Sequence, residues 1–205
     1  MKISAELVAK RFHNHHIFKN VSLQFEAPAC YALLGANGSG KSTLLRIIAG
    51  IQSPTKGKII HSLDGKEIAP EDCFRNISFC APGMDLVEEM TLKEFLIFHF
   101  GFKKMLAGFT IDKIIELTGL KNVENKFIGD YSSGMKQRVK LAQAIFSDTP
   151  ALFLDEPCTN LDQKGVDQYR NWVTDYGKNR LVIIASNELR EYDFCNNHIE
   201  MESLK

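Results

Sequence analysis

A glycine-rich loop between a short apolar strand and a helix constrains this chain more than any other feature. The loop reads Gly35-Ala36-Asn37-Gly38-Ser39-Gly40-Lys41-Ser42-Thr43 and fits the spacing G-x-x-x-x-G-K-[ST]. Residues 29–35 before it are apolar enough for a strand, and residues 43–50 after it have helical spacing and end in glycine. The chain therefore contains the strand, loop and helix that open many α/β domains.

The residue types of this loop suit a phosphate chain. Gly35, Gly38 and Gly40 permit backbone angles that a side chain forbids, so successive N–H groups can surround an anion at a helix N-terminus. Lys41 is expected to reach the β- and γ-phosphates, and the Ser42 hydroxyl to coordinate Mg²⁺. A glycine-rich turn that carries a lysine by chance is the alternative. The flanking strand and helix favour nucleotide binding.

Composition limits the classes of partner. Lys+Arg and Asp+Glu both number 25, so no broad basic face for nucleic acid is expected. The five cysteines are scattered and form no C-x-x-C pair, which predicts a reducing cytosol rather than a disulfide framework. No apolar run approaches the roughly 18 residues that span a bilayer, and the N-terminus lacks the apolar region of a signal peptide. A role at a membrane would be peripheral.

The first quarter of the chain predicts an antiparallel pair of strands at residues 3–8 and 17–25, because the second alternates apolar and polar residues. His13, His15 and His16 lie between them and could ligate a metal ion. Consecutive residues in a short connection rarely converge on one ion, so a solvated loop is favoured. After the glycine-rich loop we expect short strands at residues 58–61 and 77–80, with Asp64-Gly65 as a hairpin turn.

From about Asp85 to Pro150 the pattern becomes helical. Thr91 is expected to cap one helix, and residues 112–117 form another before Gly119. Aromatic residues at near-helical spacing favour a buried core, with an exposed docking patch as the alternative. They are Phe95, Phe98, Phe100 and Phe102.

Two adjacent carboxylates follow the apolar run at residues 151–154. They stand at the carboxyl end of an expected buried strand, where parallel sheets bind their ligands. Asp155 is expected to hold Mg²⁺ directly or through water, and Glu156 to polarise an attacking water. Structural acids at a strand end are the alternative, but together with the phosphate loop the pair predicts a functional site.

Residues 131–138 open a helix with small residues and serines, which alone indicates no more than a helix cap that can bind an anion. The last third of the chain contains Asn160-Leu161-Asp162, an expected helix at residues 166–176 and an apolar strand at residues 181–185. Ser186-Asn187-Glu188 follows that strand.

These segments, in this order, resemble the ATP-binding cassette (ABC) ATPases that power membrane transporters. The resemblance extends from Phe12 to about Cys195. It implies an α/β fold with a P-loop NTPase core, a mixed, mostly parallel sheet, an N-terminal antiparallel β subdomain and an inserted α-helical subdomain. Residues 1–205 would form one domain, with residues 1–84 and 151–205 as the core and residues 85–150 as the helical subdomain.

The resemblance also assigns roles to residues. Phe12 would stack on adenine, residues 35–43 would bind ATP, and Ser42 and Asp155 would hold Mg²⁺. Lys41, Glu156 and Asn187 would be catalytic, and Asp162 would lie in the loop that crosses the dimer interface. The family signature would clamp the γ-phosphate of ATP held by the opposite subunit. In this chain it reads Ser132, Ser133, Gly134 and Met135.

The signature itself departs from the family pattern, which usually reads Ser-Gly-Gly-Gln, and two further departures matter more. Gly83 stands where the family usually has a glutamine that touches magnesium and the attacking water, and Asn187 stands where it has a histidine on the γ-phosphate. One lost transition-state contact costs on the order of 100- to 1000-fold in rate. Asn187 keeps a donor amide, whereas Gly83 has no side chain. We therefore expect slow but real hydrolysis that depends on dimerisation and is stimulated by a membrane partner.

The resemblance implies a cytoplasmic ATPase subunit, peripheral on the inner face of the cell membrane, that pairs with a second cassette and serves separate membrane subunits. The brevity of the chain favours export. An ATP-binding clamp or regulatory cassette that scarcely hydrolyses ATP is the alternative. A cassette acting on ribosomes or DNA is disfavoured by the zero net charge. A simple phosphotransferase would leave residues 132–138 unexplained.

Overall fold

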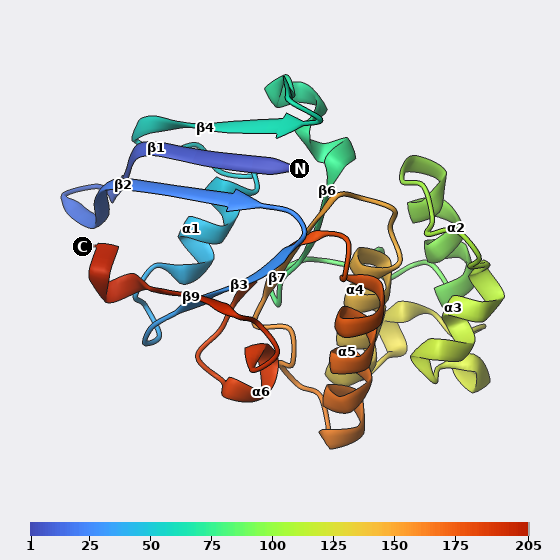
Figure 1. Ribbon diagram of the computed structural model, residues 1–205. Helices are drawn as coiled ribbons and strands as arrows, with labels where there is room; N and C mark the ends of the chain where they lie inside the picture. The colour runs from blue at the N-terminus through green and yellow to red at the C-terminus, as the bar shows by residue number, and fades with distance from the viewer. Residues whose placement is uncertain (205) are drawn as a thin grey trace.

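The computed structural model describes residues 1–204, which form two sheets with helices between and beside them (Figure 1). The strands of the larger sheet are β3 (Ala29–Leu34), β6 (Ile77–Cys80), β7 (Ala151–Asp155), β8 (Leu181–Ala185) and β9 (Asn197–Glu200). They lie in the order β6-β7-β8-β3-β9, and every neighbouring pair runs parallel. β7 and β8 are buried along their whole length because both faces of the sheet are covered.

The smaller sheet is antiparallel. Its strands are β1 (Lys2–Phe12), β2 (His15–Glu26), β4 (Lys56–Leu63) and β5 (Lys66–Glu67), in the order β2-β1-β4-β5. Asp64 and Gly65 join the last two strands with φ values of 52° and 78°, the conformation that a two-residue hairpin turn requires. The antiparallel N-terminal pair, the hairpin and the α/β class predicted from the sequence are confirmed.

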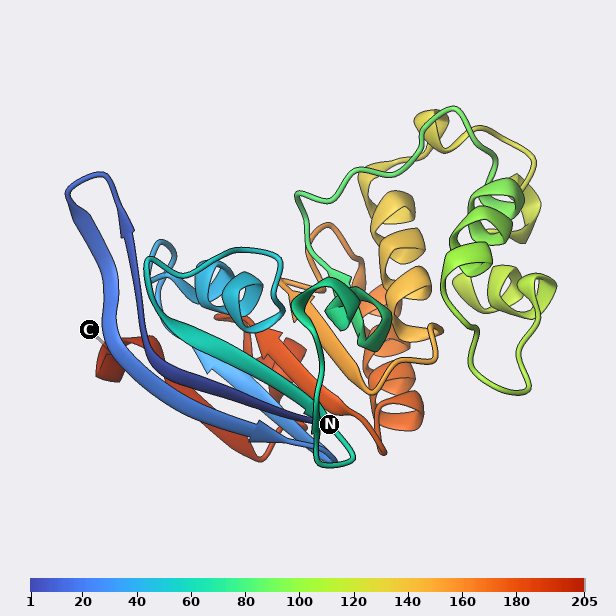
Figure 2. The same cartoon turned by 90° about the horizontal axis from the view of Figure 1, so that it is seen from above.

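Helices cover the parallel sheet. The longer ones are α1 (Lys41–Ile48), α2 (Leu92–Phe102), α3 (Ile111–Thr118), α4 (Ser133–Ile145) and α5 (Gln163–Tyr176), followed by the single turn α6 (Leu189–Tyr192). Four 3₁₀ turns complete the described residues: η1 (Pro70–Asn76), η2 (Lys121–Val123), η3 (Ile128–Asp130) and η4 (Met201–Leu204). In Figure 2, α2 and α3 lie on the far side of α4 from the antiparallel sheet.

The two faces of the parallel sheet belong to different hydrophobic clusters, since successive strand side chains point to opposite sides. In β7, Ala151 and Phe153 pack with α1 and the antiparallel sheet. Leu152 and Leu154 pack with α2, α3, α4 and α5. The sheet is therefore the central layer, and the loops at its carboxyl edge are held between two cores.

The expected Thr91 cap of α2 and the expected end of α3 at Gly119 are confirmed, whereas α5 starts at Gln163, three residues before the expected position. Thr91 accepts from the Glu94 N–H at 3.3 Å while the Glu94 carboxylate accepts from the Thr91 N–H at 2.9 Å, which closes a capping box on α2. Gly119 ends α3 in the left-handed conformation, at φ 71°.

The prediction of a buried aromatic cluster is wrong for two of its four members. Phe95 is buried and Phe100 packs against the core, but Phe98 and Phe102 are 47% and 75% exposed. Phe98 and Phe102 are four residues apart and share the outer side of α2, with ring centroids 5.1 Å apart. Only one side of this helix reaches the core, so the alternative of an exposed patch holds for these two rings.

The expectation that the chain has no disulfide is also wrong. Cys30 and Cys195 are bonded, with Cα atoms 4.8 Å apart, and Cys73, Cys80 and Cys158 are free and buried. The parallel register that pairs Tyr31 with Asn197 brings the two bonded cysteines together. Scattered positions along the chain carry no information about that register.

Candidate nucleotide-binding site

The glycine-rich loop leaves the carboxyl end of β3 and enters α1. Gly35, Gly38 and Gly40 have φ values of 149°, 80° and 105°, in the region that side chains disfavour. A Cβ atom on Gly40 would come within 2.4 Å of Ile17 Cγ2, so this backbone also lies too close to β2 for a side chain. No side chain caps α1 at Gly40, which leaves the first N–H groups of the helix to an external acceptor.

The Lys41 side chain folds back over this loop. Its Nζ donates to the carbonyl oxygens of Gly35 at 2.7 Å and Ala36 at 3.2 Å, and the residue is buried. Ser39 Oγ is buried with no hydrogen-bond partner among the described residues. A buried ammonium and an unpartnered hydroxyl beside open helix N–H groups fit a phosphate chain, because they supply the donors that phosphate oxygens accept.

Ser42 joins this loop to the first of the two adjacent carboxylates. Its hydroxyl donates to Asp155 Oδ1 at 2.7 Å, and Arg46 Nη2 lies 4.0 Å from Asp155 Oδ2. Burial raises the pKa of Asp155, and the Ser42 hydrogen bond and the Arg46 charge oppose that rise. A hydroxyl and a desolvated carboxylate side by side fit Mg²⁺, which prefers oxygen ligands.

Glu156 follows β7 with φ 43°, and its N–H donates to Ala185 O at 2.9 Å. This turn directs Glu156 toward the glycine-rich loop. A pocket of about 200 Å³ lies between them. It is lined by Ile17, Asn37, Gly38, Gly40, Lys41, Ser42, Thr43 and Glu156.

Asn187, after β8, also reaches the loop. Its Nδ2 donates to Asn37 Oδ1 at 3.2 Å, across 150 residues of sequence. β8 lies between β7 and β3, and all three strands run parallel, so Glu156, Asn187 and Lys41 follow strand ends at the same edge of the sheet.

Phe12 is less closely associated with the loop. It ends β1, is partly exposed, and has Lys10 Nζ 5.1 Å from its ring centroid. A second pocket of about 320 Å³ beside the loop is lined by neighbouring residues of β2 but not by Phe12. That lining consists of His15, His16, Ile17, Phe18, Lys19, Gly38 and Ser39.

The three clustered histidines are exposed at the β1–β2 turn. Among residues 1–204, no group of three or more histidine, cysteine or acidic side chains could hold a metal ion together. None of the helices described there is long and apolar enough to cross a bilayer.

The predicted signature segment opens α4 and contacts the Asn160–Asp162 loop. Ser132 Oγ accepts from the Met135 N–H at 3.3 Å, which confirms the helix cap. A Cβ atom on Gly134 would come within 2.7 Å of Asn160 O. Arg138 donates to Asp162 Oδ1 at 2.9 Å, and the two segments enclose a pocket of about 340 Å³.

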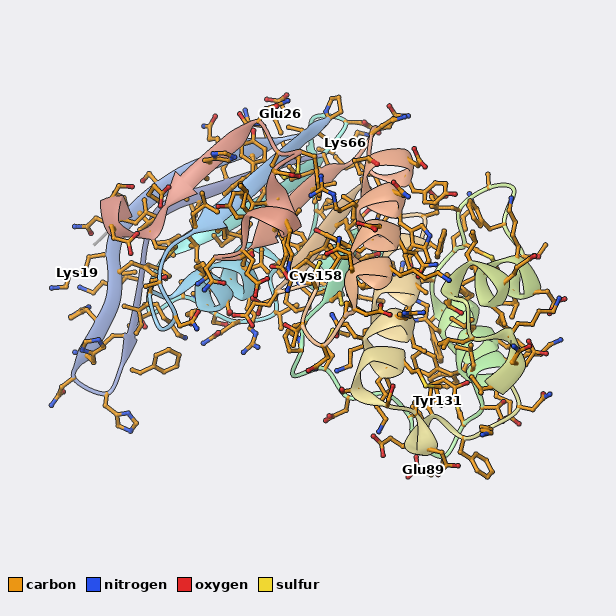
Figure 3. The ribbon with its side chains drawn as sticks, turned by 90° about the horizontal axis from the view of Figure 1, so that it is seen from below. Lys19, Glu26, Lys66, Glu89, Tyr131 and Cys158 are labelled. Carbon is orange, nitrogen blue, oxygen red and sulfur yellow. A yellow bond between two sulfur atoms is a disulfide. The ribbon has the colours of Figure 1, made fainter. Side chains whose placement is uncertain are left out.

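This signature pocket shares no lining residue with the pocket at Lys41 and Glu156. Figure 3 shows Tyr131, directly before Ser132, and Glu89 at one end of the molecule, with Lys19 of β2 at the other. The structure therefore does not bring residues 132–135 to the chain's own phosphate loop.

Gly83 lies in the turn after β6, exposed, and nothing stands within 4 Å of a Cβ atom built there. Pro82 precedes it, and its carbonyl accepts from Lys140 Nζ at 2.7 Å. Neither residue has a side-chain amide, so this turn supplies none to the pocket.

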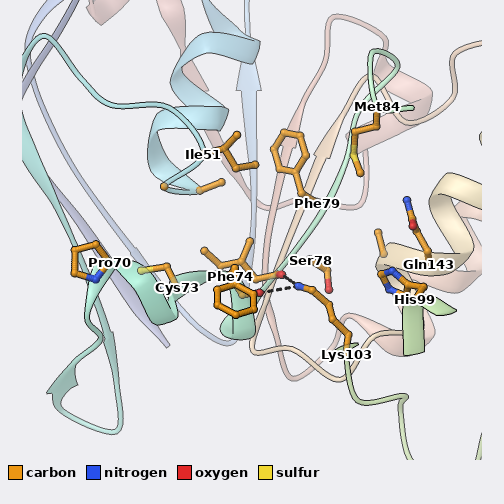
Figure 4. Close-up of a pocket in the computed structure, with 14 residues that line it drawn as sticks. Ile51, Pro70, Cys73, Phe74, Ser78, Phe79, Met84, His99, Lys103 and Gln143 are labelled. Carbon is orange, nitrogen blue, oxygen red and sulfur yellow. Dashed lines mark hydrogen bonds between the residues drawn. The ribbon is translucent and has the colours of Figure 1, made fainter. Parts of the chain in front are cut away.

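An apolar groove of about 400 Å³ lies between η1, β6, α2 and the C-terminal end of α1 (Figure 4). Phe74 and Ile51 are exposed at this groove, and Phe79 and Met84 also line it. Lys103 donates to the carbonyl oxygens of Phe74, at 2.8 Å, and Ile77. Burial lowers the pKa of Lys103 to about 8.

Two buried links to the loops at the carboxyl edge of the parallel sheet were not predicted. Gln137 of α4 donates to Pro157 O at 2.8 Å, directly after Glu156. Glu191 of α6 is buried and accepts hydrogen bonds from Cys158 and Ser186. Gln137 lies within a helix and Glu191 within a single turn. Neither has a local sequence pattern that distinguishes it from an exposed polar residue.

The family model described as ABC transporter matches residues 18–159. An uncharacterized ABC transporter ATP-binding protein of Bacillus subtilis, YxlF, is 34% identical over 98% of this chain and 68% of its own length. The sulfate/thiosulfate import ATP-binding protein CysA of Thermosynechococcus vestitus is 34% identical over 84% of this chain. This chain covers about half, 52%, of that relative's length.

Among solved structures, the dimeric post-hydrolysis state of the ATP-binding cassette MJ0796 bound to ADP and Pi superposes with a TM-score of 0.80. The superposition covers 97% of this chain and 93% of that one at 21% identity, which shows the shared fold.

Proposed function

The chain belongs to the ABC transporter family of ATP-binding proteins, and on that premise we propose that it hydrolyses MgATP as a dimer to drive separate membrane subunits. Members of this family bind ATP, pair as cassettes and act with membrane subunits. The observation that carries the proposal is the 2.7 Å hydrogen bond from Ser42 to Asp155, made beside a pocket that Glu156 lines. It joins a phosphate-binding loop to a pair of acids at one edge of the sheet.

The proposed reaction is in-line attack of water on the γ-phosphorus, with cleavage of the bond to the ADP oxygen. Glu156 takes the proton of the attacking water as general base. Lys41 and the open N–H groups of α1 hold the phosphate oxygens and stabilise their charge. Ser42 and Asp155 would hold Mg²⁺, which supplies further positive charge to the phosphates when bound.

A second cassette is part of the proposed site. Residues 132–135 open the 13-residue helix α4, and the positive end of a helix favours an anion. Because the pocket there is separate from the chain's own phosphate loop, its proposed ligand is the γ-phosphate held by a partner cassette in a head-to-tail pair. Loss of that phosphate on hydrolysis would remove the charge that holds the pair together.

Slow turnover is part of the proposal. The turn at Gly83 has no side-chain amide to contact the attacking water. Asn187 occupies the position where the family usually has a histidine. The same two positions support the second candidate, a cassette that binds ATP and dimerises but scarcely hydrolyses it. Glu156 lining the pocket favours the hydrolysing cassette.

The proposed partner surface is the apolar groove of Figure 4, and its proposed occupant is a helical segment of a membrane subunit. Met84 lines this groove and lies in the segment that leaves the carboxyl end of β6 and leads to α2, so an occupant would contact that segment. A peripheral position on the inner face of the cell membrane follows from that partner. We propose no direction of transport, because the relative CysA is named as an import protein.

ATP turnover by the purified protein with Mg²⁺, beside the Glu156→Gln variant, tests the proposal. We expect turnover in the native chain, a loss of about 100-fold or more in the variant, and a stable ATP-bound dimer of the variant on size-exclusion chromatography. Glu26→Gln, at an exposed acid on β2, is the matched control and should leave turnover unchanged.

Three outcomes separate the candidates. Absence of ATP binding contradicts both. ATP-dependent dimerisation of the native chain without turnover, even with its co-purified membrane partner, favours the clamp. If the Glu156→Gln variant keeps ATP turnover, Glu156 is not the general base.

A further inference from the structure

Glu191 is an acid in an unusual setting. It belongs to the single turn α6 and is 3% exposed, yet its carboxylate has no basic side chain as a hydrogen-bond or ion-pair partner among the described residues. The adjacent Arg190 pairs with Glu188 instead, at 2.6 Å. A buried carboxylate is retained only where hydrogen-bond donors replace water.

Those donors come from two loops at the catalytic edge. The Cys158 N–H donates to Glu191 Oε1 at 2.7 Å, and the Ser186 hydroxyl donates to Oε2. Cys158, labelled in Figure 3, follows Glu156 by two residues, and Ser186 directly precedes Asn187. One carboxylate therefore bridges the loop of the general base and the loop of the γ-phosphate amide.

The backbone around Glu191 is fixed from the other side. Its carbonyl accepts from the Tyr169 hydroxyl of α5 at 2.7 Å, and its N–H donates to Glu188 O at 2.9 Å. The Glu188 N–H donates to Ser186 Oγ at 2.9 Å, so the Ser186 hydroxyl is held from two directions. Tyr169 therefore contacts only the backbone of Glu191, whereas the bonds to Cys158 and Ser186 are made by its carboxylate.

Few other contacts keep these loops together beyond the sheet. The register of β7 and β8 ends at Asp155 and Ala185, and the hydrogen bond from the Glu156 N–H to Ala185 O is the last backbone bond between the two strands. After it, the loop of Cys158 and the loop of Ser186 are joined through Glu191. An error of about 1 Å in the position of a reacting group can cost about 100-fold in rate.

We propose that Glu191 is a positioning residue that holds the Glu156 loop and the Asn187 loop in one fixed relation, so that base and γ-phosphate amide act on the same phosphate. The inference rests on the proposed function of Glu156 and Asn187. Glu191 itself touches neither nucleotide nor water in the reaction. Its role depends on the length and shape of the side chain rather than on its charge.

Three substitutions separate shape from charge. Glu191→Gln keeps the length: its oxygen can accept from Cys158, its amide can donate to Ser186 Oγ, and the Ser186 hydroxyl can turn to Glu188 O, 3.4 Å away. Glu191→Asp keeps the charge but is one methylene too short to reach both donors. Glu191→Ala removes both bonds. Tyr169→Phe is the matched control, because it removes the buried hydrogen bond of Glu191 that reaches neither loop.

We expect Glu191→Asp and Glu191→Ala to lower kcat at least about tenfold with the dissociation constant for ATP within about threefold, since Lys41 and the phosphate loop remain. Glu191→Gln and Tyr169→Phe should keep kcat within about threefold. Amide hydrogen exchange without nucleotide supplies a second readout. Exchange in residues 156–159 and 186–189 should rise together in Glu191→Asp and stay native in Glu191→Gln.

Native kcat and native exchange in Glu191→Asp would overturn the inference. An equal loss of kcat in Tyr169→Phe would also overturn it, because Glu191 would then contribute only to the stability of the fold. A Glu191 variant that binds ATP more weakly but keeps native kcat would overturn it as well. Failure of the proposed function looks different, because the native chain itself would then show no turnover. Hydrogen exchange still decides in that case whether Glu191 joins the two loops.

Discussion

The Ser42 hydroxyl donates to Asp155 Oδ1 at 2.7 Å, although 113 residues separate the two in sequence. One residue comes from the N-terminal end of α1 and the other from the last position of β7. The bond fixes the phosphate loop against the acids, so the two halves of the site have a defined spacing before any ligand binds.

Removing either partner should change the magnesium requirement more than nucleotide affinity. We expect Asp155→Asn and Ser42→Ala to raise the Mg²⁺ concentration for half-maximal turnover about tenfold or more, because each takes away one oxygen ligand. A magnesium titration of ATP turnover measures it. Asp64→Asn, in the exposed β4–β5 turn, is the control. An unchanged magnesium requirement in both site variants would exclude them as ligands.

Gly134 and Gly101 should respond oppositely to alanine. A Cβ atom on Gly134 would meet Asn160 O at 2.7 Å, and backbone cannot easily move, so Gly134→Ala should lower the free energy of unfolding by about 1–3 kcal/mol. Gly101 lies in α2 with nothing within 4 Å, so Gly101→Ala should raise it by about 0.5–1 kcal/mol.

Urea unfolding of the two variants measures this pair. Gly134→Ala should also weaken ATP-dependent dimerisation, because it shifts the signature segment against the Asn160–Asp162 loop. Equally small changes in the free energy of unfolding at both glycines would mean that the signature segment can shift to accommodate a Cβ atom at little cost.

Local patterns predicted much of the fold. The spacing at residues 35–43, the alternation in β2 and the Thr91 capping box each act over fewer than about ten residues, so a sequence pattern contains them fully. The family resemblance supplied the long-range expectation that Asn187 lies near the phosphate loop, and its amide does contact Asn37.

The features that the sequence did not predict depend on how strands pair and on which side of a helix meets the core. The Cys30–Cys195 bond follows from the pairing of β3 with β9, which no local pattern encodes. Phe98 and Phe102 are as apolar as Phe95, and only the side of α2 on which they fall leaves them exposed. Glu191 is recognisable as buried only after α6 is placed over the ends of β7 and β8.

Acid should destabilise the fold through His99. Burial, and then the charge of Lys103, lower the pKa of His99 to about 4, while a backbone hydrogen bond at Gln143 opposes them. Nε2 lies 3.0 Å from Ser147 Oγ. The ordinary pKa of histidine is 6.5, so between pH 4 and pH 6.5 His99 binds more protons in the unfolded chain than in the folded one. The stability due to neutral His99 is present above pH 6.5 and is lost as pH falls toward 4.

Thermal unfolding between pH 7.5 and pH 5 should therefore show a smaller loss of Tm in His99→Gln than in the native chain. His13→Gln, at an exposed histidine, should follow the native curve. The raised pKa values of Asp155 and Glu191 act in the opposite direction, and the comparison between variants cancels them. Parallel curves for all three proteins would contradict the assignment.

Thiol counting tests the bond between Cys30 and Cys195. Unfolded without reductant, the chain should show three reactive thiols, from Cys73, Cys80 and Cys158, and five after reduction. Cys195→Ser should lower the free energy of unfolding by about 2–4 kcal/mol in the oxidised protein and far less in reductant. Five thiols without reductant would show that the pair is not bonded in solution.

The position of β3 between β8 and β9 affects the order in which the chain becomes functional during its synthesis. The phosphate loop is made early, yet neither neighbouring strand of β3 exists until residues 181–200 leave the ribosome. Asn37 and Asn187 are 150 residues apart, so at about 5–20 residues per second the loop waits about 8–30 s for its partner. A nascent chain that bound a nucleotide before then would do so without the contact between Asn187 and Asn37.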